Sequence, residues 1–242
     1  MEKYIKLFIL VSFSLLLFGC SSRDNTIVMV TNSGFEPYEY VKNNEVVGVD
    51  VDIAREIAKE MGKKLEIKDV AFDSIISELN SGKADFAAAG MSITEERKKQ
   101  VDFSIEYISS KQVVVVNKNN KTIKTKDDLN NKTISVQLGT VADTYVSDNY
   151  KGAKIIRQKK FLSAAEDVKV GKSDCIIMDE LPAKELVVKN NELTILDIEL
   201  INDKYAIAVK KGNTELLNTI NNVLEKLMRE GKIEEYVINH SS

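Results

Sequence analysis

Residues 84–104, ADFAAAGMSITEERKKQVDFS, hold the strongest structural signals in the chain. The apolar run at 86–89 predicts a buried strand. Gly90 ends that strand and lets the backbone pass close to other groups. Ser92 offers a hydroxyl for a small anion, and Arg97, in the first turn of a polar helix, can pair both oxygens of a carboxylate. Taken alone, the charged turn is more typical of a solvated helix face.

The chain on either side of this stretch alternates between strands and helices. Before it we expect strands at 26–31 and 64–70, an amphipathic helix at 50–61, a hairpin turn at 42–45 and a helix capped by Asp73 at 73–81. This alternation predicts an α/β fold with a mostly parallel sheet and helices on both faces.

The second half repeats the alternation in a separate block. Strands are expected at 112–117, 133–136, 154–157, 174–178, 193–196 and 205–209, with helices between them and a long amphipathic helix at 213–230. Cys175 lies in an apolar strand and is expected to be a small core residue. Two such blocks predict two lobes.

The segment 90–99, GMSITEERKK, followed by VDFS at 101–104, resembles the signature of the family 3 extracellular solute-binding proteins. Those proteins bind polar amino acids for ABC importers. Residues 48–52, GVDVD, resemble a second segment of the family, and the similarity extends to about Tyr236. The resemblance implies a two-lobed, type II periplasmic-binding-protein-like fold with a central ligand cleft. It places lobe 1 at 26–108 plus 203–242, lobe 2 at 109–202, and hinges near 107–111 and 200–204.

The same resemblance implies how an amino acid is held. Arg97 takes the ligand carboxylate, helped by the N-terminal backbone of a helix at Thr140 and Val141, where peptide N–H groups favour anions. Asp179 takes the ammonium, although from the residues alone a helix N-cap is the favoured role. The remaining positions expected to contact the ligand main chain from the first lobe are Gly90, Met91 and Ser92.

The ligand side chain is expected to lie between Phe35 and Phe72, with Gln137 and Met178 at its far end. For each phenylalanine, core packing is the alternative from the residues alone. Asn32 occupies a position that is often acidic in binders of basic amino acids, so a neutral polar side chain is favoured. Glu36 would reverse this expectation if it pointed inward.

The N-terminus has the layout of an export signal at 1–19, with Lys3 and Lys6 before a short apolar run. The residues at 17–20, LFGC, resemble a lipobox that would make Cys20 a lipid-anchored N-terminus followed by a tether at 20–25. A secretory signal cut elsewhere is the alternative. We therefore expect export, with anchoring at the outer face of the cell membrane or in the periplasm.

Composition excludes several other function classes. A net charge of -3 and the absence of Trp argue against nucleic-acid binding. His240 is the single histidine and lies near the C-terminus, which we expect to be frayed, so a Ser-His-Asp or Cys-His enzyme is not expected. We expect no cofactor or metal, a monomer, and an ABC permease as partner. A dehydratase of similar fold and a sensory ligand-binding protein remain the alternative functions.

Overall fold

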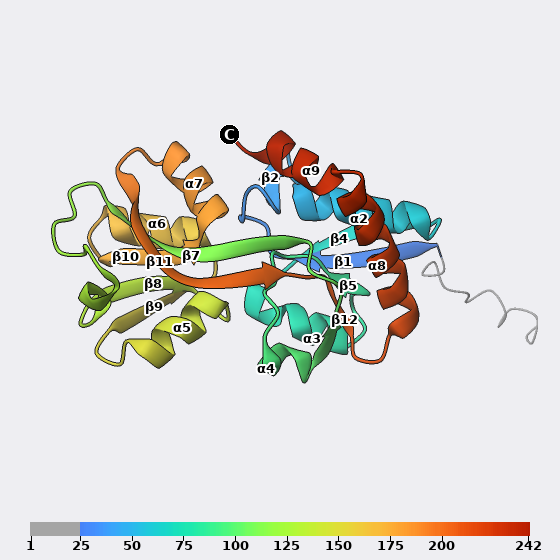
Figure 1. Ribbon diagram of the computed structural model, residues 1–242, viewed down its shortest axis with the longest axis horizontal. Helices are drawn as coiled ribbons and strands as arrows, with labels where there is room; N and C mark the ends of the chain where they lie inside the picture. Colours follow the sequence, from blue (N-terminus) through green and yellow to red (C-terminus); the bar gives the residue numbers. More distant parts are fainter. Residues whose placement is uncertain (1–24) are drawn as a thin grey trace, which may run out of the picture.

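The computed structural model describes residues 25–242. The expected signal peptide at 1–19, the lipidation site at Cys20 and nearly all of the tether at 20–25 lie outside the described residues. Two five-stranded sheets, each flanked by helices, form two lobes that lie end to end (Figure 1). The predicted α/β class and the two-lobed arrangement are confirmed.

The first lobe has a mixed sheet. Its order is β4 (Lys64–Asp69), β1 (Thr26–Thr31), β5 (Phe86–Ala87), β12 (Ala208–Lys210) and β6 (Val101–Phe103). β1 runs parallel to β4 and β5, as the strand-helix alternation predicts. β12 returns from the end of the chain and runs antiparallel to β5 and β6.

Helices cover both faces of this sheet because its strands alternate apolar side chains between two layers. Ile27 and Met29 of β1 face one layer, and Val28 and Val30 face the other. The helices of the first layer are α2 (Val49–Glu60), α8 (Thr214–Arg229) and α9 (Lys232–His240), and that of the second is α3 (Ile75–Asn80). Smaller elements are the hairpin of β2 (Tyr40–Lys42) and β3 (Glu45–Val47), the 3-10 turn η1 (Phe72–Ser74) and α4 (Glu95–Lys98).

The second lobe has its own mixed sheet, in the order β11 (Leu193–Tyr205), β7 (Ile108–Asn117), β10 (Cys175–Asp179), β8 (Thr133–Gln137) and β9 (Lys154–Gln158). β8 runs parallel to β9 and β10, and β7 runs antiparallel to β10 and β11. Cys175 is fully buried, as expected. The helical elements are η2 (Lys126–Leu129), α5 (Val141–Asn149), α6 (Phe161–Lys169) and α7 (Glu180–Lys189).

The two lobes are joined by β7 and β11, which run side by side across the middle of the molecule (Figure 1). Their pairing begins at Ile108 opposite Tyr205 and continues to Asn117 opposite Leu193. The expected hinges at 107–111 and 200–204 therefore fall almost entirely within paired strands. The expectation of a short strand at 193–196 is wrong, because β11 continues to Tyr205. Register shifts between Leu196 and Glu199 and between Glu199 and Asn202 interrupt the regular pairing but do not end the strand.

Three further expectations are corrected. Asp73 lies inside η1 and does not cap α3. The strand expected at 205–209 is divided, since β11 ends at Tyr205 and β12 begins at Ala208. His240 is not frayed: it ends α9, where its Nε2 lies 2.8 Å from Asp52 Oδ2 and its Nδ1 lies 3.1 Å from the Tyr40 hydroxyl.

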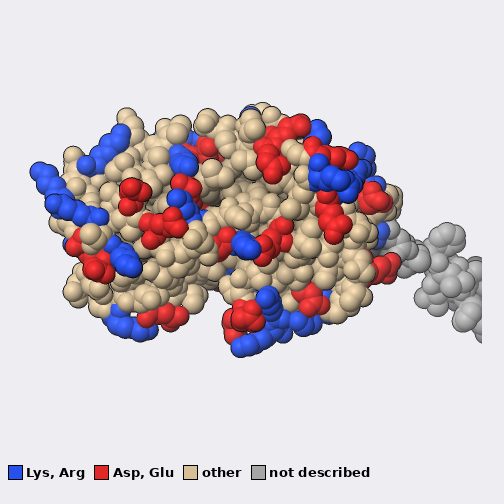
Figure 2. Space-filling view, viewed as in Figure 1, with Lys and Arg blue, Asp and Glu red and all other residues tan. Residues whose placement is uncertain are grey.

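Acidic and basic side chains are interspersed over the face shown in Figure 2, without a broad patch of one sign on that face. A mixed surface of this kind supplies no electrostatic track for a polyanion there. Among the helices of residues 25–242, none combines the length and the apolar character needed to span a bilayer.

Candidate functional site

A small cavity lies between the lobes, where strands of both sheets end. The loops after β1, β4 and β5 of the first lobe reach it, as do those after β8 and β10 of the second. Ligands of open α/β sheets bind at such strand ends. The cavity is lined by Asn32, Phe35, Glu39, Phe72, Ala89, Gly90, Ser92, Arg97, Gln137, Thr140, Val141 and Asp179.

Arg97 reaches into this cavity from α4. Thr94 caps the helix by accepting a hydrogen bond from the Arg97 backbone N–H at 3.1 Å. The guanidinium donates to the Ser92 carbonyl (2.6 Å) and, across the gap, to the Gly139 carbonyl (3.0 Å). It also lies over the Phe72 ring, 5.3 Å from its centroid. Burial lowers the pKa of Arg97 to about 10, which leaves the side chain charged at neutral pH.

Gly90 is held in place by a buried carboxylate. Its N–H donates to Asp50 Oδ2 at 2.8 Å, and the Tyr107 hydroxyl donates to Asp50 Oδ1 at 2.7 Å. Gly90 has a φ of 51°, and a Cβ built on it would lie 2.6 Å from a ring carbon of Phe35. Only glycine fits this position without displacing the aromatic ring.

Asp179 comes from the second lobe, at the end of β10. It occupies the N-cap position of α7 but makes no capping hydrogen bond. Its Oδ1 instead accepts hydrogen bonds from Ser110 Oγ (2.9 Å) and from the Tyr205 hydroxyl. Burial, followed by the nearby carboxylate of Asp203, raises the pKa of Asp179 to about 7. Asp179 therefore occupies the N-cap position without acting as a capping residue.

Thr140 is the N-cap of α5 in the second lobe, and Val141 is the first residue of that helix. The Thr140 side chain accepts a hydrogen bond from Asp143 N–H at 3.3 Å and donates to the Gln137 carbonyl at 2.8 Å. Gln137 Nε2 crosses to the first lobe and donates to Asn32 Oδ1 at 2.7 Å. The N-terminus of a nine-residue helix thus faces the cavity, where its dipole favours an anion.

Both predicted aromatic residues line the cavity. Phe35 also stacks on Phe161 of α6, with ring centroids 5.5 Å apart and an interplanar angle of 25°. Phe72 lies beneath the Arg97 guanidinium. Phe35 therefore has both expected roles: its ring packs against the opposite lobe, and one side of it lines the cavity.

Met91 and Met178 are the two predicted site residues that do not line the cavity. Met91 lies between Gly90 and Ser92, so chain alternation turns its side chain into the first-lobe core beside α3. Met178 precedes Asp179 on β10 and points to the opposite face of the strand, toward Phe161. That face borders a separate gap of about 180 Å³.

Sequence reasoning missed Glu39 and Ala89. Glu39 is fully buried, and its Oε2 accepts no hydrogen bond from the described residues. Burial, then the adjacent Asp50, raises the pKa of Glu39 well above its usual range. Little in the sequence indicates that Glu39 is buried, because an acidic residue between Tyr38 and Tyr40 is typical of an exposed position beside a hairpin.

The cavity is nearly closed, with a free volume of about 10 Å³. Ion pairs cross between the lobes at its rim: Lys189 of α7 pairs with Glu36, and Lys160 Nζ lies 3.8 Å from Asp69 Oδ2. Glu36 therefore points to the rim and does not line the cavity. These contacts, with the Arg97 and Gln137 bridges, describe a closed arrangement of the lobes.

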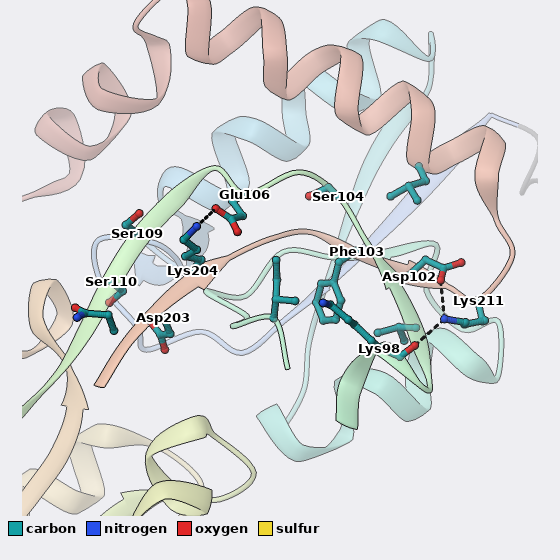
Figure 3. Close-up of a pocket in the computed structure, with 14 residues that line it drawn as sticks. Lys98, Asp102, Phe103, Ser104, Glu106, Ser109, Ser110, Asp203, Lys204 and Lys211 are labelled. Atoms are coloured by element: carbon teal, nitrogen blue, oxygen red, sulfur yellow. Dashed lines mark hydrogen bonds and ion pairs between the residues drawn. The ribbon is translucent and has the colours of Figure 1, made fainter. Parts of the chain in front are cut away.

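A larger groove of about 880 Å³ lies on the first-lobe side of the crossing strands (Figure 3). It is separate from the cavity described above. Lys204 and Glu106 form one ion pair across it, at 2.6 Å, and Lys211 and Asp102 form another, at 2.9 Å. We call it the hinge groove, and Asp203 lines it. Within residues 25–242, no three His, Cys, Asp or Glu side chains are grouped to hold a metal ion.

The family model described as "Bacterial extracellular solute-binding proteins, family 3" matches residues 27–239. The chain belongs to this family. The two-lobed fold and the cavity at the strand ends are those of a solute-binding protein, and the resemblance noted from residues 90–104 is confirmed.

Known family 3 proteins similar to this one include the ABC transporter arginine-binding protein 1 of Escherichia coli, at 31% identity, with 97% of each chain covered. The arginine-bound form of truncated ArgBP from T. maritima is 42% identical, with a TM-score of 0.82 and coverage of 84% of this chain and 97% of that one. An ancestral arginine-binding protein bound to glutamine is 39% identical, with a TM-score of 0.83 and coverage of 88% and 98%.

Proposed function

We propose that this solute-binding protein holds an amino acid between its lobes and delivers it to the permease of an ABC importer. The observation that carries the proposal is the meeting of Arg97 from one lobe and Asp179 from the other in one buried cavity. A zwitterion can be buried only when both of its charges are paired and hydrogen-bonded. Arg97, together with the α5 N-terminus, suits the carboxylate, and Asp179 suits the ammonium.

The cavity favours a ligand that brings a net positive charge. Among the described residues that line it, Arg97 is the single cation, against the carboxyl groups of Glu39 and Asp179. Asp50 and Asp203 lie directly behind them. Glu39 Oε2 is a buried acceptor without a donor, and leaving such an atom unpaired costs about 1–3 kcal/mol. A guanidinium or ammonium at the end of the ligand side chain would satisfy it.

We therefore propose a cationic amino acid, with arginine first, in place of the neutral polar ligand expected from Asn32. Asn32 does line the cavity, but its side chain is engaged with Gln137 and with the Val70 carbonyl. The names of the arginine-binding relatives support the same choice. A neutral amide is the second candidate, because a protonated Glu39 also accepts an amide N–H and a similar protein is described bound to glutamine.

Isothermal titration with arginine, lysine, glutamine and citrulline tests both levels of the proposal. Citrulline has nearly the shape of arginine without its charge, so it isolates the charge contribution. Tight binding of arginine and at least about tenfold weaker binding of citrulline, a difference of about 1.4 kcal/mol, would support a cationic ligand. Equal affinities, or preference for glutamine, would favour the neutral class, and no heat with any amino acid would reject the function.

We further propose that the ligand leaves unaltered, so that the protein is a carrier without enzymatic activity. No histidine approaches the cavity among the described residues, since His240 is paired with Asp52 and Tyr40 on the first lobe. Mass spectrometry of each amino acid after prolonged incubation would return the starting compound. Recovery of a dehydrated product would instead support the dehydratase alternative.

The lobe boundaries expected from the sequence, 26–108 with 203–242 and 109–202, are retained as part of the proposal. We also propose a monomer tethered by lipid on Cys20 at the outer face of the membrane. Detergent-phase partitioning of the native protein, compared with a Cys20→Ala variant, tests the tether. Sedimentation of residues 25–242, which hold both sheets, tests the monomer.

A further inference from the structure

Asp203 lies on β11 where the strand crosses between the lobes, opposite Ser110 of β7. Its Oδ2 accepts hydrogen bonds from Ser92 Oγ at 2.8 Å and from Gln112 Nε2 at 3.3 Å. Ser92 lines the ligand cavity, whereas Asp203 lines the hinge groove, where Figure 3 shows it near Ser110. Asp203 therefore connects the cavity to a solvent-exposed groove.

The same stretch of paired strands supports Asp179. Ser110 and Tyr205 both donate to Asp179 Oδ1, and Tyr205 lies two residues after Asp203 on β11. Gln112 donates to Asp203 Oδ2 and lies opposite Asp179 in the β7–β10 pairing. The two acidic side chains thus share one polar cluster, formed by Ser110, Gln112 and Tyr205.

This cluster has more acceptors than donors. Asp203 Oδ1 and Gln112 Oε1 are both buried and accept no hydrogen bond from the described residues. Two neighbouring buried carboxylates do not both ionise readily, and a shared proton is the usual resolution. A proton supplies the missing donor, and an ammonium can supply it equally well.

The charged and titratable groups around Asp179 come from several elements. They are Asp203 and Tyr205 on β11, Tyr38 and Glu39 before or at the start of the hairpin, Asp50 on α2 and Arg97 on α4. Arg97 is the single cation of this set. Its contacts with the Ser92 and Gly139 carbonyls leave it without a carboxylate within 4 Å among the described residues. Burial of Asp203 raises its pKa as well.

We propose that Asp203 is a positioning residue of the ammonium site, which shares one proton with Asp179 until the ligand's α-ammonium displaces that proton. The proposal rests on the amino-acid binding proposed above. One positive charge enters the cavity with the ammonium and one leaves as the proton, which passes to solvent or buffer through the hinge groove. Asp203 also orients Ser92, so the hinge strand sets both the charge and the geometry of the site.

Titration calorimetry in buffers of different ionisation enthalpy measures this proton directly. With arginine at pH 6, the wild type should release close to one proton per binding event, and its affinity should weaken about tenfold per pH unit below the pKa of the pair. Asp203→Asn keeps an oxygen for Ser92 and should lose most of the release. Its affinity should then change less than about threefold between pH 8 and pH 6. Glu199→Gln, on the same strand but exposed and paired with Lys111, is the charge-matched control and should match the wild type.

The failure of this proposal is distinct from failure of the proposed function. If the wild type binds arginine with the same heat in every buffer, or Asp203→Asn releases as many protons as the wild type, the shared proton is rejected while amino-acid binding stands. If no amino acid binds, the shared proton can still be tested by measuring how the thermal unfolding midpoint of the ligand-free protein depends on pH. The wild-type midpoint should fall from pH 5 to pH 7.5 more steeply than that of Asp203→Asn, and equal slopes would reject the proposal.

Discussion

The two ends of the cavity are built differently. At the carboxylate end, Arg97 is a single cation whose donors already engage the carbonyls of Ser92 and Gly139, one from each lobe. At the ammonium end, Asp179 is accompanied by Glu39, Asp50 and Asp203, with acceptor atoms left unpaired. Among the described residues, the guanidinium of the first end is already held by hydrogen bonds, whereas the second end gathers acidic groups without a cation. On the proposed binding mode, affinity would come from both ends of the cavity, whereas selectivity would come from the acidic end.

Removal of Arg97 is the most damaging test of this comparison. Arg97→Ala takes away the one cation among the described residues that line the cavity and leaves a ligand carboxylate among acidic groups, so binding should weaken by about 4 kcal/mol or more. That corresponds to roughly a thousandfold increase in Kd. Calorimetry with arginine measures it.

Lys98→Ala is the matched control, because Lys98 is the next residue on α4 but is exposed and paired with Glu95. Its affinity should remain within about twofold of the wild type. Similar losses in the two variants would mean that α4, and not the Arg97 guanidinium, is what the ligand requires.

Glu39→Gln sharpens the comparison at the acidic end. The substitution keeps the size of the side chain but removes its ability to ionise, so arginine should bind about 2 kcal/mol more weakly, roughly thirtyfold. Glutamine or citrulline should lose much less. The quantity to measure is the ratio of the two dissociation constants. An unchanged ratio would place the ligand side chain away from Glu39.

The pH dependence of stability tests the charge surplus without any ligand. Burial raises the pKa of Asp179 to about 7 and that of Asp50 to about 6, from unfolded values near 4. The folded state therefore binds protons more tightly than the unfolded chain. The contribution of these groups to the free energy of unfolding is full below pH 4 and declines as pH rises toward 7.

Asp179→Asn should remove most of that decline, which we expect to be of order 2 kcal/mol between pH 5 and pH 7.5. Urea unfolding of the wild type and variant at both pH values measures the difference in slope. Parallel pH profiles would mean that Asp179 is ionised and well solvated in the folded protein.

The rim should matter least. Lys189 is half exposed, and its ion pair with Glu36 joins the lobes outside both ends of the cavity. Lys189→Ala should therefore weaken ligand binding by only about 0.5 kcal/mol, with less effect at high salt. A large loss would show that closure of the lobes, more than the charges inside, limits affinity.

The sequence was sufficient for features with a periodic or local physical cause. Apolar runs located most strands of both sheets, although β6 (Val101–Phe103) was not expected. The loop from Gly90 to Arg97 was recognisable because a strand end, a glycine and a capped helix follow one another. It was insufficient where tertiary pairing overrides local preference. Residues 200–204 were expected to be a hinge connection, yet pairing with β7 makes them part of β11, the longest strand of the described residues.

Glu39 was missed for a related reason. An acid between two tyrosines, just before a hairpin, is ordinarily solvated, and only tertiary packing beside Asp50 of α2 makes Glu39 buried. Met178 was expected beside Asp179 at the cavity, but successive strand residues face opposite sides, and its side chain lies toward Phe161.

The order of the first sheet has a consequence for how the chain matures. β12 lies between β5 and β6, so a strand from the last part of the chain completes the interior of a sheet begun by the first. All five strands of the other sheet lie in one uninterrupted stretch, from Ile108 to Tyr205. A polypeptide that emerges N-terminus first can thus assemble its second half while the first still awaits its final strand, and the binding cleft is the last feature to form.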